Sequence, residues 1–153
     1  MKLRSWQAEA FPLWWDKQQG IIKVVTGGGK TFFAIHCIKE YIKASPEKDI
    51  LIVVPSIALL DQWSEALSEN NINQEVLLNG GGEKVDKSAK IIVTTIDSLK
   101  NILDLVNAEN SLLIVDECHK IGTEKRGDML SNNWSATLGL SATPERDYDD
   151  NFY

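Results

Sequence analysis

Three consecutive glycines followed by Lys30 and Thr31 join an apolar segment, residues 21–25, to a segment with helical periodicity. Because glycine has no side chain, the backbone N–H groups of such a loop can turn toward an anionic oxygen. Lysine adds a positive charge, threonine adds a hydroxyl that can reach a metal ion, and the start of the next helix adds its dipole. A strand, this loop and a helix in that order predict a site for the phosphates of a nucleotide.

The loop departs at one position from the strict phosphate-binding pattern G-x-x-x-x-G-K-[ST]. Val24 stands where that pattern has its first glycine. A glycine-rich turn that happens to carry Lys-Thr is the alternative interpretation, and the loop alone leaves both open. The residues expected to hold the nucleotide are Thr26, Gly27, Gly28, Gly29, Lys30 and Thr31.

Apolar runs alternate with helix-like segments along the chain, which predicts an α/β fold with a mainly parallel sheet. Strands are expected at 21–25, 50–54, 75–78, 91–93, 112–115 and 138–140, and helices at 30–43, 56–69 and 96–106. A further helix should begin with Ser5 as its cap and be kinked or restarted at Pro12. Polar residues follow five of these strands, and loops after parallel strands meet at one edge of the sheet, so we expect a ligand site there.

Length and charge limit the class of protein. The 153 residues are 43% hydrophobic and 25% charged, which suits one globular domain, and no apolar run has the length of a membrane span. We therefore expect a cytoplasmic protein with reduced cysteines and no membrane partner. The net charge of −6 argues against a small nucleic-acid-binding module with a basic face. The same net charge is compatible with a nucleic-acid motor that binds a strand through backbone amides and hydroxyl groups. Asp147, Asp149 and Asp150 are expected to form a solvated end or linker. Trp14 and Trp15 are expected to lie in the core or at a domain edge, with base stacking as the alternative.

A second motif follows the apolar run 112–115, which leads directly into Asp116-Glu117-Cys118-His119. A carboxylate at the end of a buried strand, beside a phosphate loop, suits Mg²⁺ coordination. A second carboxylate can orient an attacking water and accept its proton. An exposed acidic turn is the alternative for this motif taken alone.

Together these segments resemble the superfamily 2 helicases, the relatives of the DEAD/DEAH-box proteins. Residues 26–31 are similar to motif I of that family, where the position of Val24 is often not glycine, and residues 116–119 are a DECH variant of motif II. The segments similar to the other motifs are Leu3–Gln7 for the glutamine motif, Pro55-Ser56 with Leu60–Trp63 for motif Ia, Thr94-Thr95 for motif Ib and Ser141–Thr143 for motif III. The matches stand in the family's order and cover almost the whole chain.

The resemblance implies a three-layer RecA-like P-loop NTPase domain, with the sheet between helices, that uses ATP and Mg²⁺. Its implied catalytic residues are Lys30, Asp116, Glu117 and His119; Thr31 and Asp116 would hold the metal, and Gln7 would read the adenine. Ser141 and Thr143 would couple nucleotide state to a strand held by Pro55, Ser56, Gly81, Gly82 and Thr94. Several plainer roles stay open: Gln7 as a cap of its own helix, His119 as a loop histidine, Gly80–Gly82 as a flexible loop, and Ser141 with Thr143 as a strand-end turn.

Members of this family resemble two fused motor domains with ATP in the cleft between them, the second supplying arginines that stabilise the transferring phosphoryl group. Of the arginines here, Arg4, Arg126 and Arg146, none stands in such a motif. We therefore expect residues 1–153 to be the first RecA-like, ATP-binding domain of a longer polypeptide that also carries the second.

An ATP-driven helicase or translocase is the leading interpretation, with DNA favoured over RNA by analogy with repair helicases and restriction-enzyme motors. Two alternatives remain: the motor subunit of a restriction enzyme, and a regulatory nucleotide-binding module that does not translocate. Glu117 argues against the second alternative, because a switch without hydrolysis does not need a water-activating carboxylate.

Overall fold

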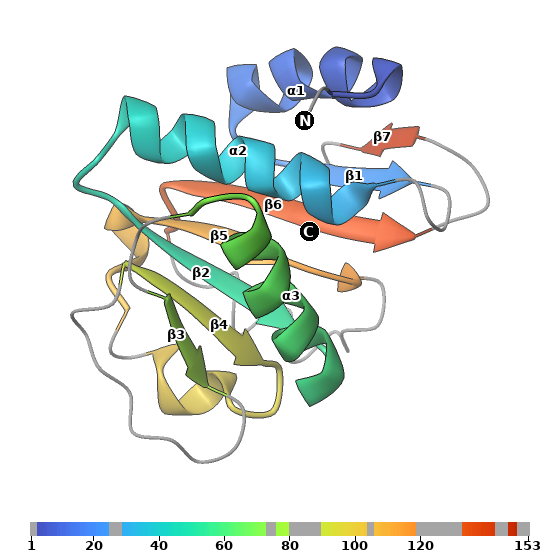
Figure 1. The fold of residues 1–153 in the computed structure, drawn as a ribbon. Helices are drawn as coiled ribbons and strands as arrows, with labels where there is room; N and C mark the ends of the chain where they lie inside the picture. Colours follow the sequence, from blue (N-terminus) through green and yellow to red (C-terminus); the bar gives the residue numbers. More distant parts are fainter. Residues whose placement is uncertain are drawn as a thin grey trace.

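The computed structural model describes residues 3–24, 29–72, 76–79, 90–103, 106–118, 133–142 and 147–149. In these ranges one sheet carries the three α-helices on one face and a 3-10 helix with turns on the other (Figure 1). The helices are α1 (Ser5–Lys17), α2 (Lys30–Ala44) and α3 (Ile57–Glu69), with 3-10 helices η1 (Leu99–Asn101) and η3 (Ala108–Asn110). The strands are β1 (Ile21–Val24), β2 (Asp49–Val54), β3 (Val76–Asn79), β4 (Ile91–Thr95), β5 (Ser111–Val115), β6 (Ala136–Ala142) and β7 (Asp147–Asp149).

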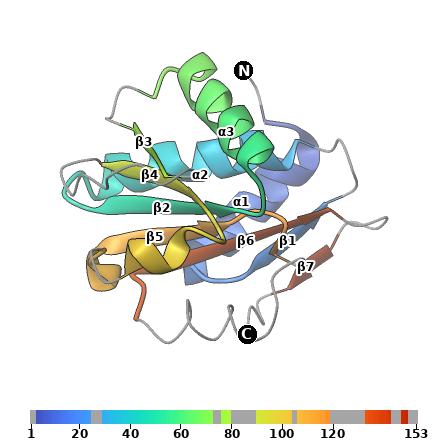
Figure 2. The ribbon, with the colours of Figure 1, turned by 90° about the horizontal axis from the view of Figure 1, so that it is seen from below.

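The described strands form a seven-stranded sheet in the order β3-β4-β2-β5-β6-β1-β7 (Figure 2). The pairs from β3 through β1 are parallel, and β7 pairs antiparallel with β1. The prediction of an α/β fold with a mainly parallel sheet is confirmed. The parallel strands end at a common edge, and β6 lies between β5 and β1, so the residues that follow β5 and β1 are separated by one strand.

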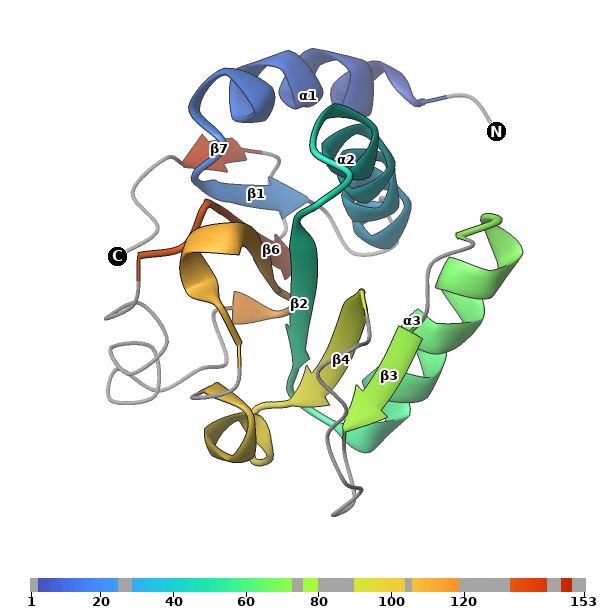
Figure 3. The ribbon, with the colours of Figure 1, turned by 90° about the vertical axis from the view of Figure 1, so that its left-hand side faces the viewer.

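Alternate residues of the central strands enter two separate cores. Ile50, Ile52 and Val54 of β2 face the core under the three α-helices. Leu51 and Val53 face the other core, which η1 and its neighbouring turns cover (Figure 3). Because both faces of these strands are buried, they read as continuous apolar runs in the sequence.

Helix α1 corrects the expected cap and the expected restart at Pro12. It runs from Ser5 to Lys17 without ending at Pro12, and its cap position is Arg4, not Ser5. Pro12 and Ala8 both lie on the exposed side of the helix, where water can satisfy the carbonyl that loses its donor. Trp14 holds the second half of the helix in place, since its side chain is fully buried and its indole N–H donates to Thr137 O at 2.8 Å.

The prediction of a helix over residues 96–106 is wrong. The described part of that stretch forms turns and η1, with backbone bonds from Ser98 N to Thr95 O, from Leu99 N to Ile96 O and from Ile102 N to Leu99 O. All three bonds join residues three apart, and the Thr95 hydroxyl also accepts from Ser98 N at 3.3 Å. Such a hydroxyl competes for the amide that would begin an α-helix, so the chain takes the tighter 3-10 form.

The acidic stretch expected to be a solvated end or linker contains β7 instead, paired with β1 through Asp147↔Lys23, Tyr148↔Ile22 and Asp149↔Ile21. A strand of three residues with acidic residues at both ends has almost no apolar alternation for sequence analysis to detect. Backbone pairing with β1, more than side-chain pattern, places it at the sheet edge.

Candidate functional site

The candidate site lies where β5, β6 and β1 end. Helix α2 begins at Lys30, directly after Gly29, and Asp116 and Glu117 follow β5. Ser141, near the end of the intervening strand β6, is buried. Parallel strands bring these segments to one edge even though they are far apart in the sequence, as the sequence analysis expected.

Lys30 makes ion pairs with both carboxylates. Its ammonium donates to Asp116 Oδ1 at 2.8 Å and also to Glu117 Oε1. The side chain of Lys30 is 20% exposed, against 2% for Asp116 and 14% for Glu117, so the cluster is largely shielded from water. Burial by itself lowers the pKa of Lys30, but the hydrogen bonds and negative charges of the two carboxylates outweigh it and raise that pKa above its ordinary value. Lys30 is therefore a stable cation at neutral pH.

Asp116 is held from three directions. Its backbone N–H donates to Val53 O of β2 at 2.8 Å. Its Oδ1 accepts from Lys30 and from the N–H of Glu117 at 2.9 Å, and its Oδ2 accepts from the indole N–H of Trp63 at 2.8 Å. Every oxygen of this buried carboxylate thus has a donor, which removes the penalty of burying an unpaired charge.

Sequence analysis missed the role of Trp63. The sequence places this residue only in the segment Leu60–Trp63, which is similar to motif Ia, and the structure buries its side chain together with Leu60 and Leu67. One signal was available: a buried indole N–H usually has a hydrogen-bond partner, so a tryptophan on the inner face of α3 requires a nearby acceptor. That the acceptor is Asp116 depends on the pairing of β2 with β5, which local sequence does not reveal.

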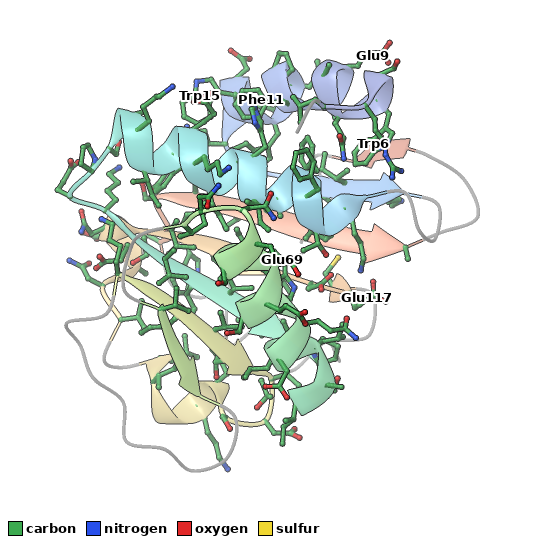
Figure 4. All side chains as sticks on the ribbon, viewed as in Figure 1. Trp6, Glu9, Phe11, Trp15, Glu69 and Glu117 are labelled. Atoms are coloured by element: carbon green, nitrogen blue, oxygen red, sulfur yellow. The ribbon has the colours of Figure 1, made fainter. Side chains whose placement is uncertain are left out.

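Glu117 has a backbone φ of 52°, in the left-handed region that non-glycine residues enter uncommonly. This turn directly follows β5 and lets two adjacent carboxylates reach the same lysine. Figure 4 marks the Glu117 side chain beyond the tip of β5. Non-glycine residues in this conformation concentrate at functional sites, where the surrounding contacts hold them in place.

Gly29 and Gln7 form a second contact at the start of α2. Gly29 has φ 86°, and a Cβ atom built there would lie 2.9 Å from Gln7 Nε2. The amide of Gln7 donates to Gly29 O at 2.9 Å, and its Oε1 accepts from Arg4 N at 2.7 Å. Gln7 therefore caps its own helix, the plainer role, and also ties α1 to the loop before α2. Recognition of adenine by Gln7 stays a prediction.

The expected nucleic-acid residues fall on two neighbouring strand ends. Pro55 and Ser56 follow β2, and the Ser56 hydroxyl caps α3 by accepting from Leu59 N at 3.3 Å. Thr94 is fully buried in β4, and its hydroxyl donates to Thr95 O at 3.1 Å. Contact of these residues with a strand stays a prediction. The predicted site residues Thr26, Gly27, Gly28, Gly81, Gly82, His119 and Thr143 lie outside the described residues.

The oxygen ligands that the structure describes near Lys30 suit an Mg²⁺ ion that binds together with a nucleotide. Within the described ranges no group of three or more His, Cys, Asp or Glu side chains could hold a metal ion by itself. Mg²⁺ is typically bound through one or two carboxylates, the remaining positions being filled by phosphate oxygens and water. Asp116 provides such a carboxylate, and Thr31, the second residue of α2, is only partly buried.

The family described as "Type III restriction enzyme, res subunit" matches residues 1–146. The chain belongs to this family. Among curated proteins, DNA 3'-5' translocase XPB2 of Sulfurisphaera tokodaii is 37% identical over 148 residues. The match covers 96% of the present chain and 32% of that translocase, so the chain spans about a third of the relative's length.

Solved structures share the fold of this chain. The SWI2/SNF2 ATPase core of Sulfolobus solfataricus, solved in complex with dsDNA, has a TM-score of 0.81 at 21% identity and covers 94% of this chain and 32% of that one. The Hef helicase domain of Pyrococcus furiosus has a TM-score of 0.73 at 25% identity, with 94% and 34% covered. The resemblance to superfamily 2 helicases and the RecA-like fold are confirmed.

Of the helices in the described ranges, none combines the length and apolar character needed to cross a bilayer.

Proposed function

We propose that this chain is the first RecA-like domain of an ATP-dependent DNA helicase or translocase, and that it binds Mg-ATP for hydrolysis. The observation that carries the proposal is the meeting of Lys30 with Asp116 and Glu117 at the start of α2. A lysine after a glycine loop and a carboxylate pair after a buried strand are the two halves of a phosphoryl-transfer site. Their distance along the chain makes a chance meeting a poor explanation.

In this proposal Lys30 exchanges its carboxylate partners for the phosphates of the nucleotide. Bound Mg²⁺ would supply positive charge that stabilises the transferring phosphoryl group. Asp116 and Thr31 would hold the metal, and Lys30 with the glycine loop would hold the triphosphate. Glu117, released from Lys30, would orient the attacking water and accept its proton. His119, Ser141 and Thr143 would report the state of the nucleotide to the strand-binding residues.

DNA is the proposed polymer because the relative XPB2 is named as a DNA translocase and the SWI2/SNF2 core was solved with dsDNA. A second RecA-like domain of the same polypeptide is the proposed partner that would complete the ATP site, and we place the protein inside the cell. The family description favours one alternative, the motor subunit of a restriction enzyme, in which a nuclease elsewhere in the protein or complex cuts the DNA.

ATP hydrolysis by the intact protein that carries this chain tests the proposal. We expect turnover that requires Mg²⁺, rises with added DNA, does not rise with added RNA, and is lost in Asp116→Asn. Absence of hydrolysis with every nucleic acid offered would refute the motor assignment. ATP-dependent cleavage of the DNA in the same assay would favour the restriction alternative, whereas strand displacement or translocation without cleavage would favour the helicase.

A further inference from the structure

Asp116 divides its two oxygens between the site and the protein interior. Oδ1 faces Lys30 and the N–H of Glu117, both of which belong to the candidate site. Oδ2 accepts the indole N–H of Trp63 at 2.8 Å. One oxygen is thus directed to the charges of the site while the other is engaged by α3.

Trp63 is well suited to fix this orientation. Its side chain is 1% exposed, so water has little access to this bond. An indole carries a single N–H donor on a rigid ring, so it cannot adjust as a flexible side chain would. Two residues separate its helix from β2, and the same strand accepts the backbone N–H of Asp116 through Val53 O. Strand β2 and helix α3 therefore hold both the backbone and the carboxylate of Asp116.

We propose that Trp63 is a positioning residue for the metal-binding carboxylate: its indole N–H holds Asp116 Oδ2 so that Oδ1 stays directed toward the metal. The inference rests on the proposed function, because it assigns Asp116 to Mg²⁺. Partners one shell beyond a metal ligand orient that ligand and influence metal affinity strongly. The competing explanation is that Trp63 only fills the core beneath α3.

The chain contains a matched control for this proposal. Trp14 is also fully buried, and it also donates its indole N–H at 2.8 Å, but to the backbone carbonyl of Thr137. Trp63→Phe and Trp14→Phe therefore each keep a buried aromatic ring and each remove one buried hydrogen bond. The two variants differ in whether the lost bond oriented Asp116.

Mn²⁺ binding in the presence of ADP, measured by electron paramagnetic resonance of the free ion on the intact protein, provides a readout independent of turnover. We expect Trp63→Phe to weaken Mn²⁺ binding by about 10- to 100-fold, and Trp14→Phe to bind Mn²⁺ as the wild type does. Equal affinity in Trp63→Phe and wild type, or equal weakening in both variants, would overturn the positioning role. A wild-type protein that binds no Mn²⁺ with ADP would instead refute the proposed function itself.

A measurement on the unaltered sequence covers the case in which Trp63→Phe does not fold. With ¹⁵N-labelled tryptophan, addition of Mg²⁺ and ADP should move the indole N–H resonance of Trp63, because Asp116 changes partners, and leave that of Trp14 in place. A Trp63 resonance that stays fixed while Mg²⁺ and ADP bind would contradict the inference.

Discussion

Replacing Lys30 with methionine tests the charge cluster most directly, because it removes the ammonium group and keeps most of the side-chain volume. At the 2.8 Å separation of Lys30 Nζ from Asp116 Oδ1, an effective dielectric constant of about 20 gives roughly 6 kcal/mol of attraction, much of it offset by desolvation. Removing one partner of a buried ion pair costs about 3–5 kcal/mol, against about 0–1 kcal/mol for an exposed pair. Lys30 is nearer the buried case, and Trp63 still donates to Asp116, so we expect Lys30→Met to lower the free energy of unfolding by about 2–4 kcal/mol.

Denaturant unfolding without nucleotide or metal measures this loss. Lys43→Met is the control, since Lys43 is largely exposed and lies 3.8 Å from Glu40. We expect the control to change stability by less than about 0.5 kcal/mol. A loss in Lys30→Met no larger than in Lys43→Met would refute the reasoning, because it would mean that the ammonium is not holding the two carboxylates together.

The pH dependence provides a second check with a definite sign. The folded state raises the pKa of Lys30, so its stabilising contribution is complete below the unfolded value of 10.5 and is lost as pH rises through the higher folded value. Burial also raises the pKa of Tyr41 and of Cys37, but both groups remain in the variant and cancel in the comparison. The stability difference between wild type and Lys30→Met should stay constant from neutral pH to 10.5 and shrink above it. A difference that shrinks well below that pH would contradict the assignment to Lys30.

Three further substitutions separate hydrolysis, loop geometry and strand contact. Glu117→Gln should slow single-turnover ATP hydrolysis by about 10²- to 10⁴-fold. ATP affinity should be retained, because the variant lacks the carboxylate that competes with the phosphates for Lys30. An equal loss of affinity would argue against a water-activating role. Gly29→Ala should lower the free energy of unfolding by about 1–2 kcal/mol because of the left-handed backbone alone. The loss should be larger when Gln7 is present than in a Gln7→Ala background, because the new Cβ would crowd the Gln7 amide. Urea unfolding midpoints measure both losses. Ser56→Asp should keep the cap of α3 and change stability by less than about 0.5 kcal/mol, yet reduce stimulation of the ATPase by DNA. Unchanged stimulation would remove Ser56 from the strand-binding surface.

Local pattern was most informative where a residue's neighbours in sequence set its environment. The glycine loop between an apolar run and an amphipathic segment predicted the start of α2, and Pro55-Ser56 predicted the start of α3 within a residue. In the stretch after β4 the apolar residues Leu99 and Ile102 are buried, although the helix expected there is not formed. Periodicity indicates which side chains point inward, but the choice between an α-helix and 3-10 turns depended on the Thr95 hydroxyl, which accepts from Ser98 N.

Residues adjacent in the chain were enough to indicate a phosphate loop, a carboxylate pair at a strand end and a parallel α/β fold, because each of these depends on side-chain chemistry and on repeats of two to four residues. The tertiary structure alone decided that β6 lies between β1 and β5, that Lys30 meets Asp116 and Glu117 across it, and that Trp63 holds the far oxygen of Asp116. These contacts join segments separated by 53 to 87 positions. They follow from the order in which strands pair, a cooperative outcome of burying both faces of one sheet that no short stretch of sequence encodes.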